Sequence, residues 1–160
     1  MRLRSARRGF SLVELLCAAL ALCVLAGAAA LTFRGRDERL VVREEAEDLR
    51  AWLSSRMAQA AREGADFRLE IDEDETTQEL GFTLQWFGGP RDLDTETYSA
   101  GRAMIKRDSL AHTHAFDGEW FTLTPAASFI IRSRRDYDAA VVLTVSGTGY
   151  VSVRETLEEQ

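Results

Sequence analysis

Residues 7–33 read RRGFSLVELLCAALALCVLAGAAALTF, and this stretch decides how the chain is organised. Apart from two cysteines, residues 10–33 contain a single ionisable side chain, that of Glu14. A helix needs about 20 consecutive apolar residues to cross a bilayer. The stretch therefore predicts a transmembrane helix at the amino-terminal end of the chain.

The charges on either side of this segment predict its orientation. Arg2, Arg4, Arg7 and Arg8 precede it, and residues 1–9 contain no acidic side chain. Arginines that flank a membrane span favour the cytoplasmic side. We therefore expect a cytoplasmic amino terminus, a single pass through the inner membrane and a periplasmic carboxyl-terminal domain.

Three ordinary interpretations of the segment remain open. A secretory signal peptide would use the A-x-A sites at residues 26–28 or 28–30, a twin-arginine signal would use Arg7 and Arg8, and a plain anchor would use neither. None of the three explains Glu14, because burying a carboxylate in an apolar segment costs about 2–3 kcal/mol. Cys17 and Cys23 lie six residues apart, about 9 Å along a helix, which is too far for a disulfide.

Residues 7–16, RRGFSLVELL, closely resemble the cleavage and methylation signature of type IV prepilins and type II secretion pseudopilins. The resemblance implies that Gly9 ends a basic leader and that prepilin peptidase cuts between Gly9 and Phe10. Phe10 would then become the new amino terminus and be N-methylated. Glu14 would be the acidic residue that meets the terminal amine of a neighbouring subunit in a filament.

The chemistry of these residue types agrees with the roles that the resemblance implies. Glycine before a scissile bond presents no side chain to a protease and lets the backbone extend. A buried carboxylate is tolerated when it is paired with a positive group. We therefore interpret Glu14 as an assembly residue and not as a catalyst.

A second helical pattern follows a short linker-like stretch at residues 34–37. Spacings of three and four residues define an apolar stripe over residues 38–63, which Trp52 and Ala61 widen. Gly64 has the position of a helix C-cap. Because no proline interrupts residues 10–63, one long helix is the simple expectation, and two helices hinged at Gly35 are the alternative. The stripe consists of Val42, Ala46, Leu49, Leu53, Met57 and Ala60.

Short strands are predicted for the rest of the chain, so the fold class is α+β. We expect strands at residues 66–71, 80–87, 98–106, 119–123, 128–132, 139–145 and 149–154. The expected core of the antiparallel sheet comprises Phe67, Leu69, Ile71, Phe82, Leu84, Trp86, Trp120, Leu123, Phe129, Ile131, Val142, Leu143, Val145, Tyr150 and Val151.

Residues 49–71, LRAWLSSRMAQAAREGADFRLEI, are similar to the helix-to-strand passage of minor pseudopilin H and of FimT-like minor pilins. This resemblance implies a pilin-like fold, in which a long amino-terminal helix, half transmembrane and half amphipathic, packs on an antiparallel sheet. The domains would be a leader (1–9), a membrane or filament-core helix (10–33) and a periplasmic globular domain (34–160). The implied function is that of a minor pseudopilin in a type II secretion system, whose filament drives protein export. The alternatives are a minor type IV pilin for pilus priming or DNA uptake, and a periplasmic binding domain on an ordinary anchor.

Net charge limits the partners that we expect. The chain has 20 basic and 26 acidic residues, and removal of the four arginines in residues 1–9 leaves 16 against 26, a net charge of −10. An acidic body repels phosphate backbones, so nucleic acid is not an expected partner. The resemblance implies prepilin peptidase, sibling pilins or pseudopilins, the inner membrane and the secretion assembly platform as partners.

The remaining polar clusters indicate no catalytic or cofactor site, and we expect the protein not to be an enzyme. His112 and His114 could face one side of a strand as a metal pair, but a surface loop explains them more simply. The acidic run Asp72-Glu73-Asp74-Glu75 could attract calcium, although it lacks the glycine of a defined loop. The basic cluster at residues 132–135 is interpreted as a loop balanced by local ion pairs.

Overall fold

A computed structural model describes residues 11–74, 76–77, 79–108, 111–136 and 138–155, and of residues 30–36 the backbone alone. The chain divides into two compact units after Arg36, and each unit is described by itself. The elements are α1 (Leu12–Glu63), β1 (Asp66–Glu73), β2 (Leu80–Phe87), the 3-10 helix η1 (Gly89–Arg91), β3 (Thr95–Ser99), β4 (Met104–Arg107), β5 (Thr113–Asp117), β6 (Thr122–Thr124), β7 (Ala127–Arg132), β8 (Ala140–Val145) and β9 (Val151–Glu155).

Helix α1 is assigned without interruption from Leu12 to Glu63, so helical backbone continues through Gly35. It ends where the sequence predicted. Gly64 has a φ of 62°, in the left-handed region that glycine adopts easily. The amide of Ala65 then donates to the carbonyl of Ala60 at 3.0 Å, which is the closing hydrogen bond of a Schellman motif.

The apolar stripe of α1 forms one wall of the hydrophobic core. All six predicted stripe residues, from Val42 to Ala60, are at most 1% exposed. Trp52 is partly buried and packs against this core. Ala61 is exposed, so its place in the stripe was predicted wrongly. The spacing of three and four residues thus predicted the buried face of the helix correctly, and the addition of Ala61 made the predicted face too wide.

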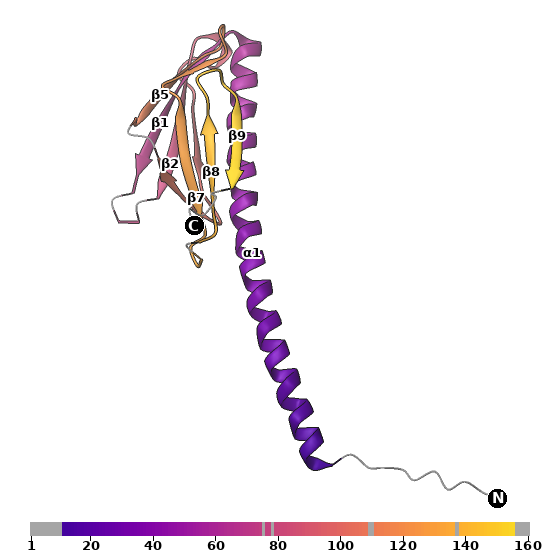
Figure 1. Ribbon diagram of the computed structural model, residues 1–160. Coiled ribbons are helices and arrows are strands. Elements are labelled where there is room, and N and C mark those ends of the chain that lie inside the picture. The colour runs from indigo at the N-terminus through magenta and orange to yellow at the C-terminus, as the bar shows by residue number, and fades with distance from the viewer. Residues whose placement is uncertain (1–10, 75, 78, 109–110, 137, 156–160) are drawn as a thin grey trace, which may run out of the picture. The chain divides into compact units, whose positions relative to one another are not determined.

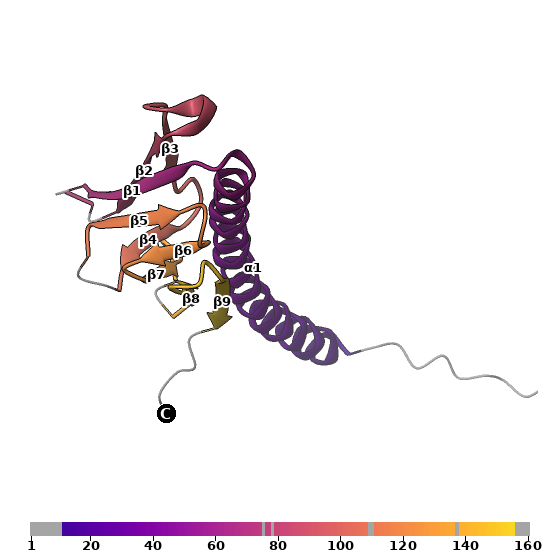
Figure 2. The ribbon, with the colours of Figure 1, turned by 90° about the horizontal axis from the view of Figure 1, so that it is seen from above.

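The strands form two antiparallel sheets, whereas the sequence suggested one. The five-stranded sheet has the order β3-β2-β1-β5-β6, and the four-stranded sheet has the order β4-β7-β8-β9. Figures 1 and 2 show both sheets on the same side of the carboxyl-terminal part of α1. Phe82 on β2 meets Phe129 on β7 edge to face, with 5.1 Å between ring centroids. The two sheets therefore share one core with the helix.

Strand register explains which side chains reach this core. Along β1, Phe67, Leu69 and Ile71 are buried and the residues between them are exposed, because successive side chains on a strand point to opposite faces. Phe67 pairs with Trp86 on one neighbour and with Phe116 on the other. The ring of Phe67 stacks on that of Phe116 at 4.7 Å. Aromatic side chains from three adjacent strands consequently fill the centre of the five-stranded sheet.

Several predicted strands need correction. The stretch 98–106 is divided between β3 and β4, and β5 was not predicted as a strand. Residues 119–121 lie in the turn that joins β5 and β6. Trp120 on that turn is 72% exposed and Tyr150 is 66% exposed, so neither belongs to the core. Trp120 lies within a tight turn and Tyr150 directly follows one, where the alternation of a strand does not apply.

The β5–β6 turn packs tightly against the end of α1. A Cβ atom on Gly118 would lie 2.2 Å from the carbonyl oxygen of Ala65 and 3.1 Å from that of Ala60. The amide of Gly118 donates to Oδ1 of Asp66 at 2.9 Å. A residue without a side chain is therefore required for this turn to close over the helix end.

Candidate functional site

The predicted cleavage and methylation residues, Gly9 and Phe10, lie outside the described residues. The segment that follows them is described from Ser11 onward. The amide of Ser11 donates to Oε2 of Glu14 at 3.1 Å, and the amide of Val13 donates to Oγ of Ser11 at 3.2 Å. Two side chains thus satisfy two amides that a helix start leaves without helical partners.

This reciprocal arrangement is a capping box, the S-x-x-E pattern at a helix start. Ser11 occupies the N-cap and Glu14 the third helical position, and both are exposed. The pattern was readable in the sequence, although the interpretation of Glu14 as an assembly residue did not include it. In the described part of the chain Oε1 of Glu14 has no hydrogen-bond partner. A carboxylate accepts several hydrogen bonds, so Glu14 can cap its own helix and still receive a second donor.

The apolar segment after this cap has the character of a membrane helix. Residues Leu12–Ala29 have a mean hydropathy of 2.4, and none of them is buried within the chain. A signal sequence near an amino terminus has the same length and composition, so hydropathy alone does not distinguish the two. Cys17 and Cys23 are free and exposed, as their spacing predicted. The apolar side chains of this segment are therefore exposed in the single chain, and a lipid bilayer or the apolar surface of other chains would be needed to shield them from water.

Glu45, a charged residue next to Ala46 of the buried stripe, is 3% exposed and holds the β3–β4 connection against α1. Its Oε1 accepts from the hydroxyl of Tyr98 at 2.8 Å, and its Oε2 accepts from the amide of Arg102 at 2.8 Å. Longer contacts of 3.4 Å come from the amides of Gly101 and Ala103. A buried carboxylate is tolerated here because several donors surround it.

These contacts determine the protonation states of Glu45 and Tyr98. Burial alone raises the pKa of Glu45, but the hydrogen bonds from Arg102, Tyr98, Ala103 and Gly101 outweigh it and hold the pKa below its ordinary value of 4.5. Burial and the neighbouring Glu45 carboxylate raise the pKa of Tyr98. Glu45 therefore remains ionised, and Tyr98 remains protonated, at neutral pH.

Glu45→Ala is expected to lower the free energy of unfolding by about 3 kcal/mol, because buried donors lose their acceptor. Glu45→Gln retains an acceptor and should lose less. Since the pKa of Glu45 is lowered on folding, its contribution is present above pH 4.5 and disappears as the pH falls further. Urea unfolding of the full chain in detergent, followed by tryptophan fluorescence, measures both effects.

Glu47→Ala is the matched control for this prediction. Glu47 lies on the same helix and pairs on the surface with Arg50 at 3.2 Å. Such exposed pairs contribute little to stability. Equal losses for Glu45→Ala and Glu47→Ala, or a stability difference between wild type and Glu45→Gln that does not narrow below pH 4.5, would contradict the role given to Glu45.

The two histidines do not form a metal pair. His114 lies on β5 and is fully buried, so the expected surface loop is wrong for this residue. Its Nδ1 donates to the carbonyl oxygen of Pro125 at 2.7 Å. His112 is exposed and lies against the guanidinium of Arg107. Among the described residues no cluster of three or more His, Cys, Asp or Glu side chains could hold a metal ion.

The charged runs are engaged within the domain. Oδ1 of Asp74 accepts from the amides of Thr76 and Thr77, both at 2.8 Å, so the described part of the acidic run forms a hydrogen-bonded turn. In the basic cluster, Arg134 pairs with Glu79 at 3.0 Å and Arg135 with Glu38 at 3.7 Å. Both arginines are paired, but their partners are distant in sequence, so the expectation of local ion pairs was wrong for them.

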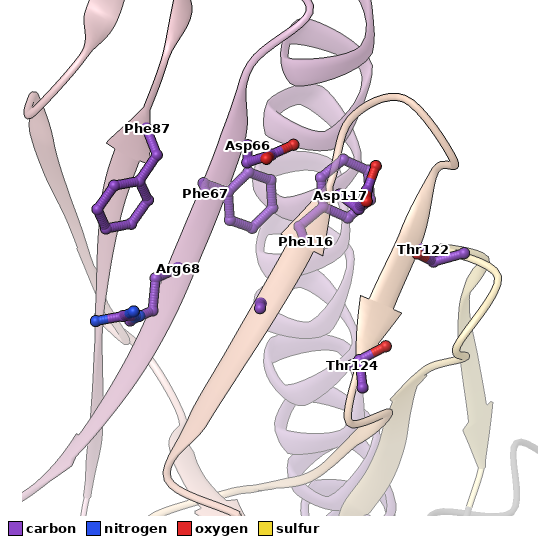
Figure 3. A pocket seen from close by; sticks show the side chains of 9 residues that line it. Asp66, Phe67, Arg68, Phe87, Phe116, Asp117, Thr122 and Thr124 are labelled. Atoms are coloured by element: carbon purple, nitrogen blue, oxygen red, sulfur yellow. The ribbon is translucent and has the colours of Figure 1, made fainter.

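A shallow hollow of about 400 Å³ lies on the outer face of the five-stranded sheet. Figure 3 shows its labelled side chains on β1, β2, β5 and β6. Arg68 lies over the ring of Phe87, 5.3 Å from its centroid. At the other end, Oδ1 of Asp117 accepts from the amides of Glu119 and Trp120. Arg68 and Asp117 are thus engaged within the domain itself.

Comparisons with known proteins agree with the sequence and the fold. The prokaryotic N-terminal methylation motif matches residues 4–30. No curated protein matches the sequence of the chain. Two crystal structures of the type IV minor pilin FimU from Pseudomonas aeruginosa, in space groups P65 and P21, are similar at 18% identity. Their TM-scores are 0.53 and 0.54, and the matches cover 70% and 71% of this chain and 91% and 87% of those chains. The expected pilin-like fold is confirmed.

Proposed function

Because this chain has the N-terminal methylation motif of type IV pilins on a pilin-like fold, we propose that it is a minor subunit of a type IV pilin-like filament. It is made with a basic leader, cut between Gly9 and Phe10 by prepilin peptidase, N-methylated at Phe10 and held in the inner membrane by residues 10–33. Its folded domain lies in the periplasm. The observation that carries this proposal is the methylation motif at residues 4–30, which includes the uncovered apolar stretch Leu12–Ala29.

The proposed role is structural and not catalytic. The apolar helix is retained after the leader is removed, unlike a secretory signal, and packs with the helices of sibling subunits. Cleavage creates an amine at Phe10, and Glu14 of a neighbour supplies the paired charge that an amine needs in an apolar filament core. The free Oε1 of Glu14 supports this pairing, because the capping box occupies Oε2 only.

Such subunits occur in type IV pili and in the filaments of type II secretion systems, and a different observation favours each of the two. Similarity to the minor pilin FimU favours a pilus. The resemblance of residues 49–71 to minor pseudopilin H favours a type II secretion filament. We propose the pilus-type assignment first and the secretion pseudopilin as the second candidate. The acidic composition of the body supports a role without direct DNA binding.

Mass spectrometry of the chain purified from its native membrane tests the proposal. The expected amino terminus is an N-methylated Phe10, with residues 1–9 absent. An intact Met1 would indicate a plain anchor. A start at Ala29 or Leu31 would indicate a secretory signal peptide, and either result would overturn the proposed function.

A further inference from the structure

An exposed face of α1 at the start of the folded domain consists of Arg39, Leu40 and Arg43, and we call it the arginine face. Arg43 is the helix-surface neighbour of both Arg39, four residues before it, and Leu40, three residues before it. Leu40 is 57% exposed beside the two arginines. In the described part of the chain neither arginine makes a hydrogen bond or an ion pair, whereas Arg50, Arg56, Arg91 and Arg102 all do.

The acidic neighbours of this face are largely turned to other partners. Glu38 accepts a hydrogen bond from the hydroxyl of Ser133 at 2.5 Å and pairs with Arg135 at 3.7 Å. Glu44 pairs with Arg102 at 2.7 Å. Asp37 is exposed and stays beside the face. The arginine face therefore presents positive charge that the domain does not neutralise.

The positive charge is concentrated at this one place along the chain. Residues 34–43 contain four arginines and two acidic residues, for a net charge of +2. Residues 44–160 contain 12 basic and 23 acidic residues, for a net charge of −11. The body as a whole is thus repelled by an anionic surface, and the arginine face is the part of the helix that is attracted to one.

The arginine face also lies close to the apolar segment in the chain. Arg39 lies six positions after Phe33, so even an extended connection keeps it within about 20 Å of the end of that segment. The headgroup layer of a bilayer begins where the hydrocarbon core ends. An exposed leucine beside two arginines suits this boundary, since its apolar side chain and their cationic ends prefer different depths.

We propose that the arginine face binds the phosphate groups of anionic phospholipids at the outer surface of the inner membrane. The proposal rests on the membrane insertion proposed above. It accounts for arginines on the side of a span where the positive-inside rule does not favour them. After removal of the leader, Arg39 and Arg43 belong with Arg34 and Arg36 to the basic residues that flank the span. The lipid contacts of the arginine face fix the depth of the subunit until it leaves the bilayer for the filament.

The test uses the chain without its leader, residues 10–160, in phosphatidylcholine vesicles that contain a trace of spin-labelled phosphatidylglycerol or spin-labelled phosphatidylcholine. The fraction of immobilised label gives the relative affinity for the two lipids. The wild-type chain should prefer phosphatidylglycerol, by up to roughly fivefold per arginine. Arg39→Gln with Arg43→Gln should abolish most of this preference, and 0.5 M salt should reduce it in the wild type because screening weakens surface attraction.

Arg62→Gln is the matched control, because Arg62 is an exposed arginine on the same helix, far from the span. An unchanged preference in the double variant, or an equal loss in Arg62→Gln, would overturn the proposal. If the double variant instead loses cross-linking between copies and keeps its lipid preference, the face binds a neighbouring chain and the lipid proposal is wrong. A chain that fails to float with any vesicle contradicts membrane insertion itself, and so the proposed function.

Discussion

Gly9→Leu is expected to leave the chain at full length in the membrane, with residues 1–9 still attached. A side chain next to the scissile bond obstructs the extended backbone that a protease binds, and glycine presents none. The uncleaved chain keeps its amino terminus blocked by the leader, so it cannot supply the amine for assembly. Mass spectrometry of the membrane fraction should show Met1 and no N-methylated Phe10.

Gly27→Leu is the matched control for this substitution. Nothing lies within 4 Å of a Cβ atom placed on Gly27, and the leucine adds apolar surface to an apolar segment. This variant should be cut and methylated as the wild type is. Normal cleavage of Gly9→Leu would contradict the peptidase assignment, whatever the behaviour of the control.

Glu14→Leu is expected to be cut and inserted normally but to be nearly absent from filaments. Without the carboxylate, the amine of a neighbouring subunit would enter an apolar core unpaired, which costs several kcal/mol. Loss of the capping hydrogen bond to Ser11 adds about 1 kcal/mol or less at this exposed helix start. The amount of the variant in sheared filaments, relative to its amount in the membrane, measures the effect.

Two further substitutions separate the charge of Glu14 from its capping role. Glu14→Gln keeps an acceptor for the amide of Ser11 and removes the charge, so it should assemble as poorly as Glu14→Leu. Ser11→Ala removes the cap oxygen that Val13 uses and keeps the charge, so it should assemble. If Glu14→Gln assembles and Ser11→Ala does not, Glu14 acts by capping its own helix and not by pairing with the amine of a neighbouring subunit.

The sequence predicted best those features that depend on local spacing. The buried stripe from Val42 to Ala60 and the stop at Gly64 follow from helical periodicity and from the conformational freedom of glycine, which are readable within a few residues. Strand β2 was predicted with its observed bounds, Leu80–Phe87, because apolar residues alternate along it. The sequence was sufficient to predict these elements because their conformation depends mainly on residues that are close together in the chain.

The errors occurred where partners come from distant parts of the chain. The burial of Glu45 was not predicted, because its charge favours the surface and the donors that stabilise it when buried come from the connection after β3. His114 was placed in a loop, but it pairs within β5 opposite Leu69. The division into two sheets also depends on long-range strand pairing, which spacing along one strand does not encode.

The candidate site was predicted in part. The motif around Gly9, Phe10 and Glu14 was recognised from its residues, and its match at residues 4–30 supports the recognition. The capping box at Ser11 was missed although its S-x-x-E pattern is local. The arginine face was missed because nothing in the sequence distinguishes a paired arginine such as Arg102 from an unpaired one such as Arg39.

The contact between Glu38 and Ser133 has a mechanical consequence. The hydroxyl of Ser133 donates to Glu38 on α1 while it accepts from the amides of Arg135 and Asp136, which ties the loop after β7 to the helix near the start of the domain. If α1 is pulled from its amino-terminal end, the force therefore reaches the hydrogen bond between Ser133 and Glu38 before it reaches the hydrogen bonds of Glu45.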